Sequence, residues 1–274
     1  MWSGRRVVAV SIFTMRSLLI YKDRWLIMRD GLMTLDNLFK ISSWNVRGLG
    51  GLSKIKQVMT RIKMLQSKVV YLQETHLTST EILRLRRRWQ GQVITASFSS
   101  HSRGVAILIH KSVPFQVTDI NADIGGRYII IQGTLLGEQL NLINVYGPNI
   151  DDQLFYNNLF LNISSLRGNI IMGGDINCAL NPLVDRSSGI DASHIQTRRV
   201  ISQFMTDMSL CDIWRVLNPD KKEFSCYSST YHTYSRIDYF LISKNLMPNI
   251  KNCTYGSIVI SDHAPLTLDY IAAI

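Results

Sequence analysis

Residues 169–177 read Asn-Ile-Ile-Met-Gly-Gly-Asp-Ile-Asn, and this stretch decides how we interpret the fold. Its apolar, isoleucine-rich start is typical of a buried strand, which Gly173-Gly174 brings to an end. Asp175 follows where the strand stops, and Asn177 lies two residues later, on the same face if the chain stays extended. Polar groups in this position lie at the rim of a sheet, where binding and catalytic sites form.

The same arrangement recurs elsewhere in the chain. Polar residues end or interrupt other apolar runs: Asn45, Glu74, Tyr146, Asp238 and the triplet Ser261-Asp262-His263. Each has an ordinary structural explanation, since asparagine can cap a turn, aspartate can cap a helix and histidine can be satisfied in a core. Six such places in one chain are hard to explain in that way, so we expect these side chains to meet in one site.

Strand-like and helix-like patterns alternate through residues 41–274. Strands are expected at 40–45, 69–73, 105–110, 128–134, 139–146, 169–172, 224–227, 233–242, 255–260 and 265–270. Helices are expected at 80–89, 154–166 and 197–208, and a further helix begins with Ser53 as its N-cap. No repeat or linker divides this region, so we predict one domain of two packed sheets with helices outside.

The composition is that of an ordinary globular protein. The 274 residues are 46% hydrophobic and 18% charged, which excludes disordered, collagen-like and coiled-coil classes. The net charge of +10 makes a polyanionic partner worth considering. No run of 18 apolar residues occurs, so we expect no membrane span. Four scattered cysteines without zinc-ligand spacing are typical of reduced thiols in an intracellular protein, nuclear or cytoplasmic.

Residues 1–40 differ from the rest of the chain. Arg5-Arg6 followed by a short apolar stretch resembles the start of a signal peptide, but Arg16 interrupts the apolar region and no clear cleavage site follows. We therefore interpret residues 1–40 as an N-terminal extension whose order the sequence does not decide. Residues 41–274 form the domain.

The residues at the strand ends suit metal-assisted cleavage of a phosphodiester. Glu74 and a second carboxylate would supply the hard oxygen ligands that Mg²⁺ prefers. A carboxylate near the phosphorus would orient or deprotonate water, Asn177 could donate to phosphate oxygens, and His263 could stabilise negative charge. P-loop nucleotide hydrolases, serine hydrolases and zincins lose support, because the chain lacks their motifs.

Five motifs, in order, resemble those of the endonuclease/exonuclease/phosphatase superfamily. They are Ser43-Trp44-Asn45-Val46-Arg47-Gly48-Leu49, Leu72-Gln73-Glu74-Thr75-His76-Leu77, Asn144-Val145-Tyr146-Gly147-Pro148-Asn149, Gly174-Asp175-Ile176-Asn177 and Ser261-Asp262-His263. Within the superfamily, the chain most resembles the endonuclease domain of LINE-type (long interspersed element) non-LTR retrotransposons. The stretches that carry this closer resemblance are 73–77, 104–108, 184–187 and 233–238.

The resemblance implies a four-layered α/β sandwich, with two packed mixed β-sheets flanked by helices and the site at the strand ends. It also implies a Mg²⁺ ion, with Mn²⁺ as a substitute, served by Glu74, Asp262 and the nearby Asn45. The catalytic set that it implies joins Glu74 to Asp175, Asn177, Tyr146, Asp238 and His263. In that set Asp175 would position or deprotonate water, and Asp238 would orient His263; which carboxylate is the general base stays open.

Candidate DNA contacts lie around this set. The basic run that includes Arg84 and Arg87 is either a solvated helix face or a phosphate contact. Residues 228–232, with Tyr231 and His232, form either a plain turn or a hairpin tip that enters a DNA groove. The further candidates are Arg186, for phosphate, and Ser225, which stands where the family usually has a threonine near phosphate.

We therefore expect a Mg²⁺-dependent endonuclease that nicks duplex DNA, as in target-site nicking for retrotransposition. An abasic-site repair nuclease is the nearest alternative, but such enzymes usually carry an acidic residue where this chain has Arg47. A catalytically inactive nucleic-acid-binding remnant and a phosphatase are the others. We expect no reverse transcriptase domain in this chain, which stops soon after His263, and the sequence does not indicate an oligomeric state.

Overall fold

The computed structural model describes residues 17–21, 24–28 and 38–272. The proposed extension over residues 1–40 therefore lies largely outside the described residues. Within it, strands β1 (Ser17–Tyr21) and β2 (Arg24–Met28) pair antiparallel. The first strand of the main body, β3, begins at Leu38.

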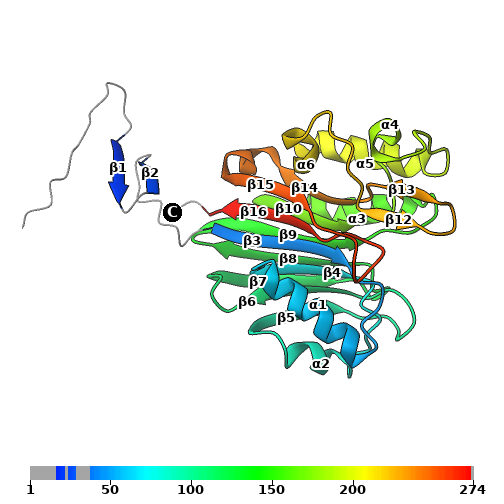
Figure 1. The fold of residues 1–274 in the computed structure, drawn as a ribbon, viewed down its shortest axis with the longest axis horizontal. Coiled ribbons are helices and arrows are strands. Elements are labelled where there is room, and N and C mark those ends of the chain that lie inside the picture. The colour runs from blue at the N-terminus through cyan, green and yellow to red at the C-terminus, as the bar shows by residue number, and fades with distance from the viewer. Residues whose placement is uncertain (1–16, 22–23, 29–37, 273–274) are drawn as a thin grey trace, which may run out of the picture.

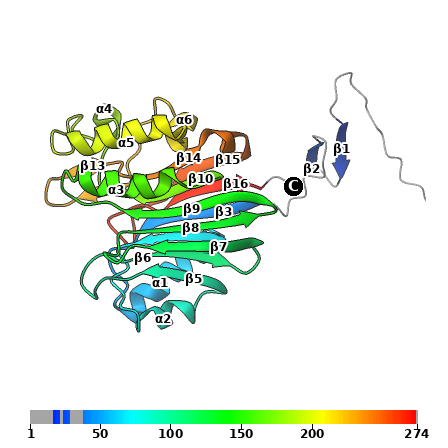
Figure 2. The same cartoon turned by 180° about the vertical axis from the view of Figure 1, so that it is seen from behind.

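Two six-stranded sheets form the centre of the body (Figures 1 and 2). The first has the order β15 (Ile250–Tyr255), β16 (Leu266–Ile271), β3 (Leu38–Asn45), β4 (Val69–Gln73), β6 (Val105–His110), β5 (Gly91–Ala96). The second has the order β11 (Leu210–Asp212), β14 (Asp238–Ser243), β10 (Asn169–Asp175), β9 (Glu138–Tyr146), β8 (Tyr128–Leu135), β7 (Phe115–Ala122). The pairs β3–β4 and β9–β10 are parallel and the other neighbours are antiparallel, so both sheets are mixed.

Helices cover the outer face of each sheet, which completes the predicted four layers (Figure 1). On the side of the first sheet lie α1 (Leu52–Met64) and α2 (Ile82–Arg86). On the side of the second sheet lie α3 (Gln153–Ser164), α4 (Pro182–Asp185), α5 (Ile195–Asp207) and α6 (Ile213–Leu217). A 3-10 helix, η2 (Lys244–Asn249), and a short hairpin of β12 (Cys226–Ser228) and β13 (Thr233–Ser235) complete the described elements.

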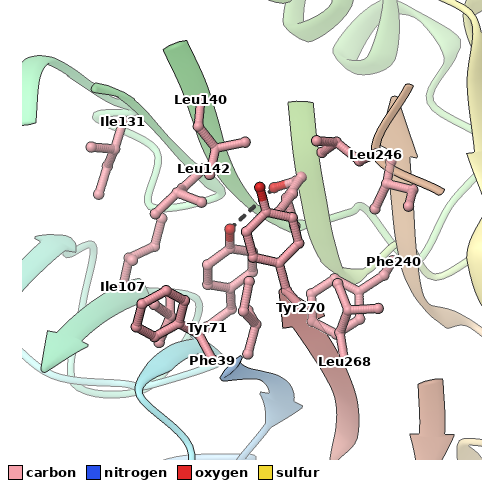
Figure 3. Close-up of a cluster of buried hydrophobic side chains, with 14 of the residues drawn as sticks. Phe39, Tyr71, Ile107, Ile131, Leu140, Leu142, Phe240, Leu246, Leu268 and Tyr270 are labelled. Atoms are coloured by element: carbon pink, nitrogen blue, oxygen red, sulfur yellow. Dashed lines mark hydrogen bonds between the residues drawn. The ribbon is translucent and has the colours of Figure 1, made fainter. Parts of the chain in front are cut away.

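The largest apolar cluster lies between the two sheets (Figure 3). Tyr71 of the first sheet and Phe240 of the second meet there with ring centroids 6.0 Å apart. The buried Tyr71 hydroxyl donates to the backbone oxygen of Ile171, 3.1 Å away, so its polar atom is satisfied across the interface. Burial of these inner faces packs the two sheets against each other, which keeps the ends of their strands at fixed relative positions.

Gly173 and Gly174 let neighbouring strands of the second sheet pack closely beside the predicted site. A Cβ at Gly173 would lie 2.6 Å from the Phe240 ring, and one at Gly174 would collide with the Val145 backbone oxygen. Gly174 also has φ +143, which side chains rarely adopt. The glycine pair is therefore required by packing as well as by the end of the strand.

A buried ion network ties the hairpin region to the second sheet. The Arg236 guanidinium contacts both Asp185 oxygens, at 2.8 and 3.0 Å, and Asp212 Oδ2 at 2.6 Å. Arg215 Nη2 adds a contact to Asp185 Oδ1 at 2.6 Å. Asp185 and Arg236 are 0% and 1% exposed, so the pair is shielded from water and salt.

Some predicted elements were wrong in their limits. Helix α1 begins at Leu52 after Gly51, so Ser53 is not its N-cap. The strand predicted at 233–242 is two strands in different sheets, because the chain leaves β13 at Ser235 to bury Arg236 before β14 begins. The strand predicted at 255–260 is wrong, since β15 ends at Tyr255.

The predictions about membranes and cysteines can be compared with the described residues alone. Within them, no helix is long and apolar enough to cross a membrane. All four cysteines are described and none forms a disulfide.

Candidate active site

Five predicted residues meet where the central strands of both sheets end, a place we call the catalytic edge. Asn45 ends β3, Glu74 follows β4, and Tyr146 and Asp175 end β9 and β10. β3 and β4 are parallel, and so are β9 and β10, so within each sheet the carboxyl ends of the two strands lie at the same edge. β14 runs antiparallel to β10, so its first residue, Asp238, faces Asp175 in register.

Asn45 connects the two sheets at this edge. Its Nδ2 donates to Glu74 Oε1 and to Asp175 Oδ2, both at 2.9 Å. Its Oδ1 accepts from the Arg47 backbone N–H at 3.0 Å, which fixes the orientation of the amide. Asn45 is fully buried, so it holds the two carboxylates without contacting solvent.

Glu74 is held from its other oxygen as well. His76 Nε2 lies 3.4 Å from Glu74 Oε2, while Asn45 occupies Oε1. The Glu74 side chain is 21% exposed, which leaves part of its carboxylate accessible. The carboxylate is therefore both oriented and available for a cation.

His263 lies between two aspartates. Its Nδ1 is 2.8 Å from Asp238 Oδ2, and its Nε2 is 3.8 Å from Asp175 Oδ2. Burial by itself lowers the pKa of His263, but the carboxylates of Asp238 and Asp175 outweigh it and hold that pKa well above its usual value. This raised pKa favours the protonated imidazole, and its Nδ1 faces Asp238.

Asp175 has an environment that opposes its ionisation. Burial is the largest cause that raises the pKa of Asp175 to about 7, and the charge of Asp238 raises it further. The charge of His263 and the hydrogen bond from the Asn45 amide lower this pKa, but they do not cancel the increase. The carboxylate is therefore poised to gain or lose a proton near neutral pH.

Tyr146 is kept protonated. Its pKa is raised above the usual value, first by burial and then by the carboxylates of Glu74 and Asp175. The Arg127 guanidinium lies 5.4 Å from the Tyr146 ring centroid and donates to the Tyr146 backbone oxygen at 3.3 Å. The phenol is therefore a fixed neutral donor next to the two carboxylates.

Asn177 reaches the edge by a different backbone path from the extended one expected. Its φ is +54, and its backbone N–H turns back to Asp175 Oδ1 at 2.8 Å. Its Nδ2 donates to the Gly147 backbone oxygen at 3.0 Å. Arg47, Glu74 and His76 also have positive φ values, of 46, 50 and 50, so left-handed backbone is concentrated at this edge.

Asp262 is paired with Arg47. Arg47 Nη1 lies 2.8 Å from Asp262 Oδ2, and the two side chains are 63% and 31% exposed. The ion predicted to use Asp262 therefore shares that carboxylate with a cation of the chain itself.

A groove of about 670 Å³ opens beside these residues. It is lined by Asn177, Asp262 and His263 and by residues of the β12–β13 hairpin, among them Tyr231, which is 76% exposed. His232 Nδ1 lies 3.3 Å from the Tyr227 hydroxyl. The predicted hairpin therefore exists, and it borders the groove.

The remaining candidates lie in other settings. Ser225 Oγ accepts from the backbone N–H groups of Ile237 and Asp238, at 3.0 and 3.1 Å, so this hydroxyl holds the start of β14. Arg186 lines the groove but pairs with the buried Asp191 at 3.0 Å. Arg84 is 3.5 Å from Glu81, and Arg87 is exposed on the α2 side of the first sheet.

The residues at the catalytic edge fit a hard divalent cation. Glu74 and Asp175 present carboxylate oxygen atoms, the ligands such ions prefer, and the Glu74 carboxylate is accessible. The Asn45 amide turns its Nδ2 toward both carboxylates, so it orients them. Donor atoms of Asp175, Asp238 and His263 also lie within 4.8 Å of one another. In that second group His263 and Asp238 bind each other, which leaves the Glu74 side as the better fit.

The sequence interpretation missed several residues of the site. His76 on Glu74 and Arg127 on Tyr146 had no assigned role, and Asn149 and His194 line the groove unforeseen. His76 stands two residues after Glu74 in the motif 72–77, so the sequence could have indicated that it belongs to the site. Arg127 and His194 are brought in by distant segments and carried none.

Known proteins are similar to this chain in sequence and in fold. The chain is 27% identical over 234 residues to the "Transposon TX1 uncharacterized 149 kDa protein" of Xenopus laevis, which covers 83% of this chain and 18% of that protein. It is also 27% identical to a DNA-(apurinic or apyrimidinic site) endonuclease of Dictyostelium discoideum, over 84% of this chain and 70% of that protein. The chain thus spans about a fifth of the transposon protein's length, and that match bears out the LINE-type resemblance.

Solved structures bear out the predicted four-layered fold. An AP endonuclease from Archaeoglobus fulgidus has a TM-score of 0.69 at 20% identity, covering 85% of this chain and 99% of that one. The AP endonuclease LMAP from Leishmania major has a TM-score of 0.71 at 18% identity, covering 86% and 89%. Residues 42–263 match the Endonuclease/Exonuclease/phosphatase family, which spans most of the chain, so this protein belongs to that family.

Proposed function

We propose that this chain is a divalent-metal-dependent DNA endonuclease that nicks one strand of duplex DNA, and that the nick serves retrotransposition inside the cell. Family membership and relatives named as a DNA endonuclease and an exodeoxyribonuclease make it a phosphodiester hydrolase that acts on DNA. The transposon relative supports the link to retrotransposition. The observation that carries the proposal is Asn45, which joins the Glu74 and Asp175 carboxylates beside the His263–Asp238 pair.

In this proposal Glu74 would hold Mg²⁺ or Mn²⁺, with Asn45, which is hydrogen-bonded to its carboxylate, and Asp262 as the further candidate residues. The ion would neutralise charge on the scissile phosphate as a Lewis acid. Asp175 orients water and takes its proton, consistent with its pKa of about 7. His263, held as a cation by Asp238, stabilises the negative charge that develops on the phosphate oxygens, while Asn177 and Tyr146 donate to them.

Hydrolysis of the phosphodiester needs no reactant besides water. Water adds its oxygen to phosphorus, and the bond from phosphorus to the 3′ oxygen breaks. The departing oxygen takes a proton and becomes a 3′-hydroxyl. The phosphate remains bonded to the 5′ oxygen of the next nucleotide. A reverse transcriptase supplied by another chain or domain could extend that hydroxyl.

An abasic-site nuclease is the second candidate, since one relative and both structural neighbours carry that name. Arg47 argues against an abasic-site nuclease. It is an exposed cation that borders the groove, and repair enzymes of the family usually carry an acidic residue at this position. Intact duplex is therefore the expected substrate.

One assay tests both candidates. Supercoiled plasmid is incubated with the full chain in Mg²⁺, in Mn²⁺ and in EDTA, and matched duplexes with and without one abasic site are cleaved in parallel. We expect open-circular plasmid with either ion, none in EDTA, and cleavage of the intact duplex. Cleavage confined to the abasic duplex would reject retrotransposition-type nicking, and hydrolysis of a small phosphomonoester alone would indicate a phosphatase.

A further inference from the structure

A second hollow lies at the edge of the first sheet opposite the catalytic edge. It has a volume of about 580 Å³, and we call it the basic pocket. Its charged and aromatic lining comprises Lys40, Lys63, Lys68, Arg88, Trp89 and His110. No carboxylate is among the described residues that line it, so the pocket is cationic.

The basic pocket is remote from the catalytic edge. Lys68 directly precedes β4, whereas Glu74 directly follows it. Six residues of extended chain span roughly 20 Å, at about 3.3 Å per residue. In Figure 1, β3 runs from the side near the label C toward the end where β12 and β13 lie. A ligand held in this pocket is therefore separate from a phosphate at Glu74.

The backbone converges to form the pocket. The Lys68 N–H donates to the Lys40 oxygen at 2.8 Å, and the His110 N–H donates to the Lys68 oxygen at 2.8 Å. The rings of Trp89 and His110 meet edge to face, with centroids 5.7 Å apart. Three strand ends and an aromatic pair thus fix the pocket before any ligand arrives.

Its cations are available. Lys40 has a loose ion pair with Asp269, at 3.7 Å, and Arg88 Nη1 donates to the Arg84 backbone oxygen. Among the described residues, Lys63 and Lys68 form no ion pair. The pKa of His110 is lowered by burial and then by the charges of Lys68 and Lys111, as expected where positive charge is uncompensated.

From this geometry we propose that the basic pocket binds the phosphates of a single-stranded nucleic acid, distinct from the strand that is cut. Clustered cations next to an aromatic ring are the combination that binds single strands. A hollow of this size accepts a nucleotide, which a flexible single strand can turn into it more easily than a base-paired duplex can. The protein then holds two nucleic-acid segments at opposite ends of one sheet.

The test uses the full chain in EDTA, where no cleavage interferes, and a labelled single-stranded oligonucleotide followed by fluorescence anisotropy at several salt concentrations. The variant Lys63→Gln/Lys68→Gln removes two cations from the pocket, while Lys56→Gln removes an exposed one from another face of α1. We expect the double variant to bind about 20-fold more weakly at 0.1 M salt, with a slope of log K against log salt smaller by about 1.4. Lys56→Gln binds close to wild type.

Nicking separates this proposal from the proposed function. The double variant should nick plasmid in Mg²⁺ at the wild-type rate, because its changes lie far from Glu74. Equal single-strand affinity and salt slope for the double variant and Lys56→Gln would overturn the proposal. So would an equal loss of affinity for intact duplex, since that result describes a general basic surface. Arg88→Gln, which changes an exposed side chain, serves as a second pocket variant and should weaken binding in the same direction.

Discussion

Arg47 Nη1 lies 2.8 Å from Asp262 Oδ2, so the carboxylate predicted to serve a metal is already paired with a guanidinium. Both side chains border the groove and are partly exposed. An exposed pair of this kind contributes only about 0.2–1 kcal/mol. An ion that used Asp262 as proposed would therefore compete with Arg47 without being excluded by it.

Removal of this competitor should strengthen metal use. We predict that Arg47→Gln lowers the Mg²⁺ concentration for half-maximal nicking by about 1.4- to 5-fold, the factor equivalent to an exposed ion pair. Nicking rates measured across a Mg²⁺ series provide the check. Asp262→Asn made in the Arg47→Gln background should abolish the gain; a gain that persists there would mean that Asp262 is not the group released.

Glu74 should be required for metal use. Glu74→Gln keeps the size of the side chain but removes its charge, so nicking should fall by more than about 100-fold while the fold is retained. Plasmid nicking, with circular dichroism for folding, measures both. Glu138→Gln is the matched control, because Glu138 is exposed at the start of β9. Nicking by Glu74→Gln at the rate of that control would place the ion elsewhere.

The His263–Asp238 contact should matter for rate more than for DNA binding. Loss of the cationic imidazole in His263→Ala should lower kcat by about 10²- to 10³-fold or more, the scale of a preorganised charge stabiliser. Asp238→Asn should be impaired in kcat at similar KM, because the amide no longer holds the imidazole as a cation. Single-turnover rates at saturating DNA measure this, and full activity of Asp238→Asn contradicts the assignment.

The buried network around Arg236 should be a stability determinant. Arg236→Met leaves the Asp185 and Asp212 carboxylates without this partner, and removing one member of a buried pair costs about 3–5 kcal/mol. Urea unfolding gives the free energy of unfolding directly. The exposed Arg167→Met should stay within about 0.5 kcal/mol of wild type. A similarly small change for Arg236→Met would show that Arg215 and water compensate.

The β12–β13 hairpin should choose where DNA is nicked. In the proposed mechanism the groups at the catalytic edge serve the phosphate and the metal, so base or shape recognition would fall to peripheral contacts. Replacing residues 229–232 by a different tip of equal length should change the nick positions on a long duplex and leave the chemical step intact. Nick positions are mapped for both proteins on the same duplex. An unchanged pattern would mean that another surface, and not the hairpin, chooses where DNA is nicked.

The sequence predicted the fold wherever strands were buried on both faces. The strand over Val69–Gln73 and that over Val105–His110 were located to the residue, because their apolar runs are continuous and bounded by turns. The edge strands β5 and β7 were missed, since half-exposed strands carry polar residues that weaken the pattern. The break at Arg236 could not be foreseen, because it depends on Asp185 and Asp212 from distant segments.

The candidate site was predictable as a set but not in its contacts. Asn45, Glu74, Asp175 and Asp238 meet because polar residues at strand ends share an edge, which depends on topology alone. His263 lies in the segment between β15 and β16, not at the end of the strand that was predicted before it. The Arg47–Asp262 pair and the inward role of Ser225 depend on side-chain geometry across loops. Periodicity carries no information about such contacts.

The left-handed backbone at Arg47, Glu74, His76 and Asn177 has a consequence for how this protein responds to selection in the laboratory. Each such residue is held in a conformation that glycine adopts at roughly 1 kcal/mol lower cost. A screen for heat resistance alone would therefore enrich glycine at these positions and discard the side chains of the catalytic edge. Thermostable variants should be sought with these four residues held constant, since here durability and catalysis are opposing demands on the same loops.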